Sequence, residues 1–195
     1  MKGQMTVQRY RAVDLFLFAG MLIIFETVII TAATRWFPGE AYTVSLVAAI
    51  TAIVMMRWGP WAAIHAVIGG IVFCRASGGG PMQYAIYCGG NLFSLGGLLL
   101  LRWMGDENIR QDTLKTLLFG FTVLLLMQAG RALVALMLGV SPQEALGFIF
   151  TDVVSMLFTL VILWIVRRLD GVFENQHHYL LRVQREQEKE RGGFR

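Results

Sequence analysis

The sequence predicts an all-α membrane protein with six transmembrane helices in a single bundle and both termini in the cytoplasm. Of its 195 residues, 56% are hydrophobic and only 15% are charged, whereas a soluble domain would carry about a quarter charged residues. The charges gather in the stretches 2–14, 102–115 and 167–195, and the segments between them carry few. We therefore expect one six-helix transmembrane domain over 1–168 and a charged cytoplasmic tail over 169–195, either helical or disordered.

A helix needs ~20 apolar residues to cross the hydrocarbon core of a bilayer. Six stretches reach this length or fall somewhat short of it. They run from Val13 to about Thr34, from about Tyr42 to Met56, from Pro60 to Phe73, from about Met82 to Trp103, from about Leu114 to Leu138, and from a cap at Ser141 to Val166. The second and third have only about 15 residues each, so we expect tilted, partly buried or re-entrant helices there.

Turn signals separate these spans. The run RWGP at 57–60 breaks the chain, because proline fits a helix only in its first turn. The glycine-rich stretch 77–81 is a flexible turn. Before the last span, Ser141 is the predicted N-cap, Pro142 the first helical residue and Glu144 the partner of a capping box.

Lysine and arginine predict the orientation, because cytoplasmic loops carry an excess of both. With the N-terminus inside, only Arg35 and Arg75 fall outside, and Arg131 lies within a span. The other basic residues fall on the cytoplasmic side: Lys2, Arg9, Arg11, Arg57, Arg102, Arg110, Lys115 and all those from Arg167 onward. The net charge of +4 therefore indicates a membrane margin rather than a nucleic-acid surface.

Polar and ionisable residues inside the spans form the candidate site. Such groups are costly in a bilayer and usually face a cavity or a partner. With a rise of about 1.5 Å per residue, those of the first, fourth, fifth and sixth spans converge on the outer half of the membrane. The predicted substrate-binding residues are Glu26, Trp36, Tyr84, Tyr87, Asn91, Gln128, Arg131, Asp152 and Ser155. The aromatic rings favour stacking on a flat ligand. The sequence leaves open whether Glu26, Arg131 and Asp152 bind a ligand or only one another.

The third span carries two weaker signals. His65, near its inner end, is expected to be an interhelical hydrogen-bond partner. Ala62, Ala66 and Gly70 recur every four residues, a spacing that allows close helix approach. This small-residue row serves either internal packing or the docking of a partner subunit.

The sequence contains no Walker A loop, HExxH motif, nucleophile elbow or metal-ligand cluster. We therefore expect neither an enzyme nor a cofactor, and an intramembrane enzyme is the least favoured alternative. Cys74 and Cys88 lack metal spacing and fit small apolar residues better than a disulfide. His177 and His178 stand alone in a polar tail, which is weak support for a metal.

Several features together carry a family resemblance over the residues up to about 168. They are the small size, the six spans, the break RWGPW at 57–61 before a short helix, the glycine-rich outer loop at 77–81 and the run QYAIYCGGNLF at 83–93. On these features the chain resembles the substrate-binding S component of energy-coupling factor (ECF) transporters, which are ABC-type importers.

The resemblance implies high-affinity capture of a vitamin or related micronutrient from outside a prokaryotic plasma membrane. The pocket would be built from the fourth to sixth helices and the outer loops. The S component would dock on a membrane coupling subunit driven by two cytoplasmic ATPases, reorient and release the ligand inside.

One departure from the family pattern concerns docking. The family often carries Ala-x-x-x-Ala in its first helix. Here the residue four positions after Ala12 is Phe16, and the residue four positions after Ala19 is Ile23, so the pattern is absent. The small-residue row of the third span is the expected substitute. The alternative function is a non-catalytic structural scaffold, resembling the rod-shape-determining membrane protein of similar size.

Overall fold

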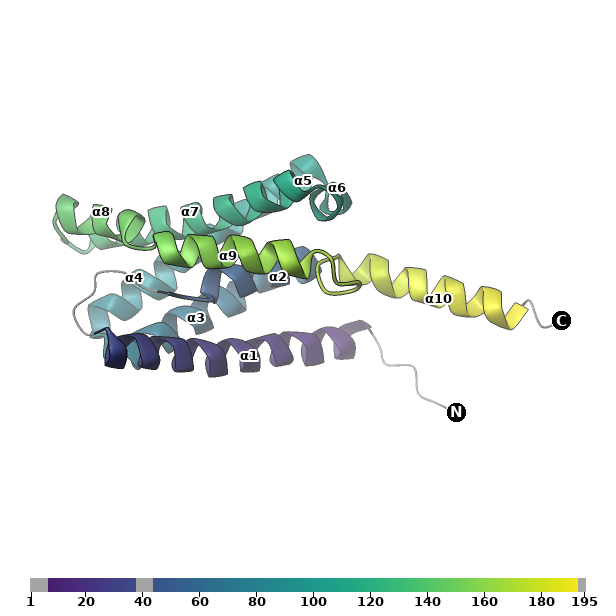
Figure 1. Ribbon diagram of the computed structural model, residues 1–195, viewed down its shortest axis with the longest axis horizontal. Coiled ribbons are helices and arrows are strands. Elements are labelled where there is room, and N and C mark those ends of the chain that lie inside the picture. Colours follow the sequence, from purple (N-terminus) through teal and green to yellow (C-terminus); the bar gives the residue numbers. More distant parts are fainter. Residues whose placement is uncertain (1–6, 38–43, 193–195) are drawn as a thin grey trace.

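The computed structural model describes residues 7–37 and 44–192, which form helices joined by short turns (Figure 1). No strand occurs in these two ranges. The α-helices are α1 (Val7–Trp36), α2 (Val47–Trp58), α3 (Ala62–Ser77), α4 (Pro81–Asn91), α5 (Gly97–Met104), α6 (Asp106–Gln111), α7 (Thr113–Met137), α8 (Pro142–Phe150), α9 (Val153–Val166) and α10 (Gln176–Gly192). Two short 3₁₀ helices, η1 (Gly59–Trp61) and η2 (Leu92–Gly96), follow α2 and α4.

The helices support the predicted membrane class. Among the described residues, five stretches are long and apolar enough to cross a membrane by length and composition: Val7–Trp36, Val47–Ser77, Pro81–Met104, Thr113–Met137 and Pro142–Val166. They match the predicted spans, except that Val47–Ser77 contains both the second and the third. The all-α membrane class is therefore confirmed at this level, and the number of six spans stays a prediction.

The stretch Val47–Ser77 folds back on itself at the predicted break. α2 ends at Trp58, where Gly59 has a positive φ of 59° that would strain any side chain, and Pro60 lies in the first turn of η1. A Cβ placed on Gly69 would collide with the Val47 side chain. Because these two residues lie equally far from Trp58 along the chain, α2 and α3 pack as an antiparallel hairpin.

α2 is the central helix of the bundle. Every residue from Val47 to Arg57 is buried, and α1, α3, α7 and α9 pack around it. Its 12 residues span only ~18 Å, whereas the hydrocarbon core is ~30 Å thick. By contrast, α1 and α9 keep large apolar side chains exposed, among them Phe16, Phe25 and Leu157, as expected of helices that face lipid.

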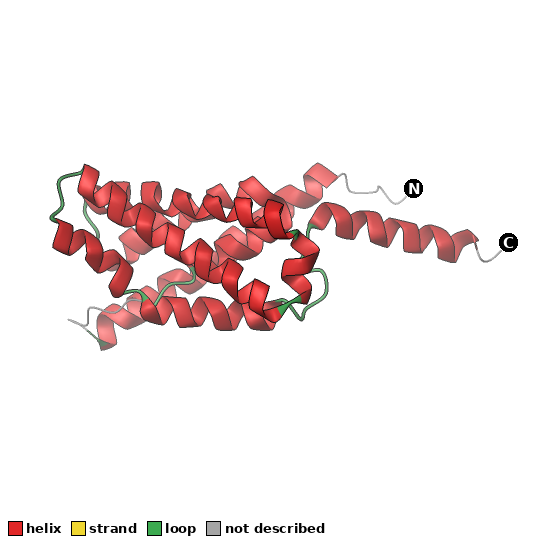
Figure 2. Cartoon of the chain, turned by 90° about the horizontal axis from the view of Figure 1, so that it is seen from above, coloured by secondary structure: helices red, strands yellow, loops and turns green. Residues whose placement is uncertain are grey.

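The first turn of α1 and the whole of α10 lie at one end of the bundle, and α8 lies at the opposite end (Figures 1 and 2). We call these the α10 end and the α8 end. Each end has a cavity, and the two cavities are lined by different elements.

The charged tail predicted over 169–195 divides into two parts. Phe173 is completely buried, and its ring centroid lies 6.4 Å from that of Phe119 in α7. Glu174 and Gln176 are also buried. The packed core therefore extends past the boundary predicted at residue 168, because an aromatic side chain anchors the start of the tail. The tail is helical from Gln176 to Gly192, where α10 projects away from the bundle (Figure 2).

Candidate functional site

A cavity of about 290 Å³ lies at the α8 end of the bundle. It is lined by Tyr87 of α4, Arg131 of α7, and Glu144, Gly147, Phe148, Thr151 and Asp152 of α8 and the turn that follows it. Residues 144, 147, 148 and 151 share one face of α8, since a helix returns to the same face every three or four residues. We call this space the α8 cavity. Its volume lies at the lower end of the range for small-molecule sites.

The α8 cavity forms where the last predicted span is interrupted. The sequence predicts one continuous helix up to Val166, but α8 ends at Phe150 and α9 begins at Val153. Asp152 stands at the N-cap position of α9, yet its side chain does not cap that helix. Its Oδ2 instead accepts a hydrogen bond of 3.1 Å from Arg131 Nη1. The ion pair thus holds the interruption against α7.

Arg131 is the centre of a buried hydrogen-bond network. Its Nε donates to Asn91 Oδ1 over 2.8 Å, and its Nη2 donates to the Met127 sulfur over 3.4 Å. Asn91 Nδ2 donates in turn to the carbonyl oxygen of Ala66 over 2.9 Å, which ties α4 to α3. The Arg131 and Asp152 side chains are each only 6% exposed, and charges at such depth require this degree of pairing.

Tyr87 forms the aromatic wall of the cavity. The guanidinium carbon of Arg131 lies 4.6 Å from its ring centroid, and the Phe73 ring stacks on it at 4.4 Å with 20° between the planes. The Tyr87 ring is thus already packed against both the Arg131 guanidinium and the Phe73 ring. Phe148 meets Tyr87 edge-on, with centroids 5.9 Å apart. Stacking of a ligand on Tyr87 would have to compete with these contacts, and it stays a prediction.

Glu26 and Ser155 belong to a second polar network. Glu26 is fully buried and accepts hydrogen bonds from Ser45 Oγ (2.6 Å) and from the N–H of Leu46 (2.7 Å). The N–H of Ser45 donates to Ser155 Oγ over 3.0 Å. Glu26 thus satisfies the backbone N–H of Leu46 at the start of α2, where the helix dipole favours a negative charge. The hydrogen-bond partners of Glu26 are therefore Ser45 and Leu46, and it forms no ion pair with Arg131 among the described residues. These contacts favour a structural role for Glu26 within the bundle.

Of the nine predicted substrate-binding residues, only Tyr87, Arg131 and Asp152 line the α8 cavity. Asn91, Glu26 and Ser155 belong to the networks described above, and three further residues lie elsewhere. Trp36 is 75% exposed at the end of α1, and Gln128 is buried on α7. Tyr84 packs against a small apolar cluster that contains Cys74. Cys74 and Cys88 are free thiols, as expected. The helical rise thus predicts the level of a residue in the bundle but does not decide whether it lines the cavity.

His65 and the small-residue row of the third span are buried between helices. His65 Nε2 is 3.1 Å from the carbonyl oxygen of Leu15, which confirms the interhelical hydrogen bond. Ala62 and Ala66 are fully buried, and a Cβ on the buried Gly70 would lie 2.9 Å from a backbone nitrogen of α4. Burial and close helix approach therefore support internal packing, and this row presents no surface for docking a partner subunit.

The residues on the cavity face of α8 are the ones that sequence reasoning missed. The N-cap half of the predicted capping box is present, because Ser141 Oγ accepts a hydrogen bond from the N–H of Glu144 over 3.3 Å. The Glu144 side chain, however, also lines the cavity, together with Gly147, Phe148 and Thr151. A pattern in the sequence could have revealed these residues. Positions 144, 147, 148 and 151 recur every three or four residues, as on one face of a helix, and they run from the carboxylate of Glu144 to that of Asp152.

A second buried arginine–aspartate pair lies at the α10 end. Arg57 Nε and Nη2 donate to the two oxygens of Asp14 over 2.8 and 2.6 Å, and its Nη1 donates to the carbonyl oxygens of Gly171 and Val172. The Trp58 indole N–H donates to Asp14 as well, over 2.6 Å. We call this arrangement the α10 clamp, since it joins α1 and α2 to the segment that precedes α10.

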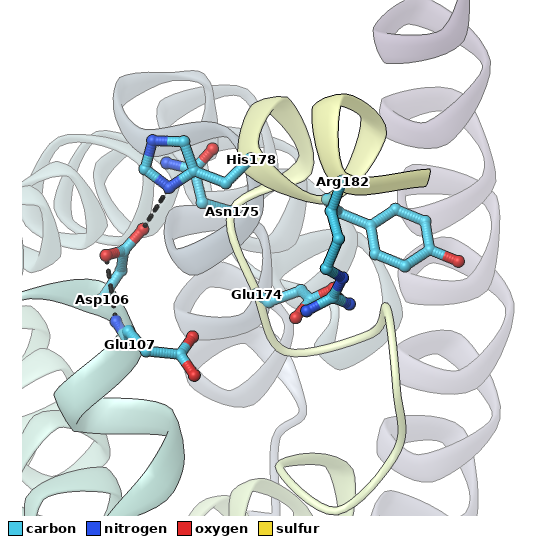
Figure 3. A pocket seen from close by; sticks show the side chains of 7 residues that line it. Asp106, Glu107, Glu174, Asn175, His178 and Arg182 are labelled. Carbon is cyan, nitrogen blue, oxygen red and sulfur yellow. Dashed lines mark hydrogen bonds and ion pairs between the residues drawn. The ribbon is translucent and has the colours of Figure 1, made fainter. Parts of the chain in front are cut away.

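Figure 3 shows a smaller cavity at the α10 end, of about 130 Å³, between α6 and the beginning of α10. Its charged side chains pair with one another. Arg182 Nη2 lies 3.0 Å from Glu174 Oε1, and His178 Nδ1 lies 3.5 Å from Asp106 Oδ2. Within the described ranges, no group of three or more His, Cys, Asp or Glu side chains is placed to hold a metal. We assign this cavity to the packing of the tail.

Arg110 of α6 completes this charged cluster. It pairs with Glu174 at 3.0 Å and with Glu107 at 3.1 Å. The hydrogen bond from Arg110 lowers the pKa of Glu107, and the same bond raises the pKa of Arg110. Both groups are thus held in their charged forms at neutral pH.

Comparison with known proteins gives no match to a family model, to a curated protein or to a solved structure. The fold and the site define the class of protein at a coarser level. The chain is an all-α membrane protein with a small cavity at one end, and a buried ion pair contributes to the wall of that cavity.

Proposed function

We propose that the protein is the substrate-capture subunit of an ECF-type ABC importer in the plasma membrane of a prokaryote. It binds a vitamin or related micronutrient in the α8 cavity and releases it inside after docking on an ATP-driven coupling module. The observation that carries this proposal is the α8 cavity with a buried guanidinium in its wall. A charge inside a membrane protein is costly, and a ligand site gives a reason for keeping it there.

The proposed topology has six spans and cytoplasmic termini, with the α8 end outside. The distribution of arginine supports this orientation. Arg57 lies in the α10 clamp, and Arg167 donates to the backbone of Arg110 at the same end. The α8 cavity then faces the medium, where a nutrient is captured.

The proposed partners are a membrane coupling subunit and two cytoplasmic ATPases. They supply ATP hydrolysis, and this chain supplies ligand binding. Because Ala62, Ala66 and Gly70 are buried, docking on the coupling subunit must use another surface of the bundle.

The second candidate function is a structural scaffold similar to the rod-shape-determining membrane protein. The observation in its favour is that Arg131 already pairs with Asp152 and Asn91. In a scaffold these contacts would only join α7 to its neighbours, and the chain would bind a protein partner constitutively.

Native mass spectrometry after mild extraction separates the two functions. A substrate-capture subunit is expected to carry a small-molecule adduct that Arg131→Ala and Asp152→Ala both lose. The control Asp170→Ala removes a carboxylate that is 96% exposed at the α10 end, and it should keep the adduct. A stoichiometric protein partner without any small adduct would contradict the proposal in favour of the scaffold. An adduct that survives both cavity substitutions would contradict the site.

A further inference from the structure

We propose that the α8 cavity takes an elongated zwitterion, with an acidic group at one end of a cyclic body and a basic group at the other. This inference rests on the proposed function, because it names the class of molecule captured at the same site. It follows from three properties of the cavity wall: unused donors, a surplus charge and the distance between them.

Arg131 has hydrogen-bonding capacity left over. A guanidinium has five N–H donors. Three of them reach Asn91, Asp152 and the Met127 sulfur, and the other two have no acceptor within residues 7–37 and 44–192. Because Arg131 lines the cavity, these donors can meet a ligand, and a carboxylate matches a guanidinium best.

Glu144 supplies the opposite charge at the other end of the cavity. Its side chain is exposed and lines the cavity, and it forms no ion pair with any residue that the structure describes. Asp152 is matched by Arg131, so the lining carries one surplus negative charge, located at Glu144. A basic group on the ligand would balance it.

The spacing of these groups sets the length of the ligand. Glu144 lies in the first turn of α8, and Asp152, which holds Arg131, lies just beyond the last residue of that helix, Phe150. The helix rises ~9 Å from Glu144 to Phe150, so a ligand that meets both Glu144 and Arg131 must hold its two charged groups well apart. The two groups of an α-amino acid lie too close together for this span, whereas substituents at opposite positions of a ring fit it.

The wall between the two charged ends carries aromatic side chains beside Thr151, and it has room. Gly147 lies between Glu144 and Asp152, and a Cβ placed on it would meet nothing within 4 Å. Phe148 and the edge of Tyr87 line the same space. An aromatic ring in the body of the ligand would pack well against edges of this kind.

Three probes of nearly identical shape test the charge requirement. 4-(Aminomethyl)benzoate carries both charges, 4-ethylbenzoate carries only the acid, and 4-isopropylbenzylamine carries only the base. Their affinities for the purified full chain are measured by isothermal titration calorimetry. We expect the zwitterion to bind about tenfold more tightly than either singly charged probe, the size of effect that one charged hydrogen bond gives.

Substitution of Glu144 locates the basic group. In Glu144→Gln, the zwitterion should bind no more tightly than 4-ethylbenzoate, and the affinity of 4-ethylbenzoate should not change. The matched control Glu107→Gln removes a carboxylate at the α10 end and should keep the full preference.

Three results would overturn this inference: no binding of the zwitterion, equal affinities for the zwitterion and 4-ethylbenzoate, or a preference that survives Glu144→Gln. The proposed function is tested separately, by the natural adduct and its loss in Arg131→Ala. A natural adduct with none of the expected charge preference would contradict the ligand class and leave the capture function standing.

Discussion

The two buried arginine–aspartate pairs, one at each end of the bundle, are built differently. Arg57 meets Asp14 through two hydrogen bonds of 2.8 and 2.6 Å, whereas Arg131 meets Asp152 through one of 3.1 Å. Arg57 also donates to two backbone carbonyl groups. Arg131 keeps two donors with no acceptor in the described part of the chain, and it borders a cavity.

This difference shows that burial alone does not separate a structural charge from a functional one. All four side chains are 12% exposed or less, and buried pairs are costly unless their hydrogen bonds are satisfied. The α10 clamp is nearly saturated by its own chain and offers little to a ligand. The α8 cavity has donors to spare. The clamp therefore serves the fold, and the cavity is the place where we propose that a ligand binds.

The largest effect on stability is expected from breaking the α10 clamp. Asp14→Ala leaves Arg57 buried without its carboxylate, and the cost should be ~3–5 kcal/mol. Thermal unfolding of the purified chain should show a clear drop in Tm, while the fraction that remains folded should still bind ligand. Asp170→Ala is the control, because that carboxylate is 96% exposed. A Tm equal to that of the wild type in Asp14→Ala would refute the structural role of the clamp.

A smaller loss of stability is expected at the α8 end. Asp152→Ala should cost ~1–3 kcal/mol, because water in the cavity can hydrate Arg131, which also keeps its bond to Asn91. The same substitution should abolish ligand binding, measured by native mass spectrometry beside the thermal melt. If Asp152→Ala were as destabilising as Asp14→Ala and still bound ligand, the roles assigned to the two ends would be reversed.

The smallest effect is expected from pH at the surface of the α10 end. Arg110 lowers the pKa of Glu107, so this carboxylate contributes stability above its usual pKa of about 4.3. The contribution is lost as the pH falls further, through the lowered pKa of the folded protein. It should be slight, because the Glu107 side chain is 55% exposed and solvent screens the pair. The Tm difference between the wild type and Glu107→Gln should shrink on acidification, and a constant difference would exclude this pair as its source.

Depth could be predicted from the sequence because a helix rises by a fixed amount per residue. That arithmetic brings Asn91, Arg131 and Asp152 to one level, and the structure joins them through hydrogen bonds. The direction of a side chain around its helix depends on tertiary packing. Trp36 is exposed at the end of α1, Tyr84 packs against the cluster that contains Cys74, and neither lines the cavity.

Interruptions of helices were harder to predict than their existence. The run at 57–60 carries glycine and proline, and the chain turns there as expected. Residues Thr151 and Asp152 carry no such signal, yet α8 ends beside them. The face of α8 that lines the cavity was missed for this reason. The burial of Phe173 could have been predicted from the sequence, because a large apolar side chain in a charged tail indicates packing against the bundle.

The central claim is that a ligand occupies the α8 cavity, and filling the cavity tests it most directly. Gly147→Leu adds a side chain to the cavity wall, where a Cβ meets nothing within 4 Å, and Gly20→Leu does the same at an equally open position on α1. The measurement is adduct occupancy by native mass spectrometry, with Tm recorded for both variants. We expect Gly147→Leu to keep its Tm and lose the ligand, and Gly20→Leu to keep both. Wild-type ligand occupancy in Gly147→Leu would contradict the claim.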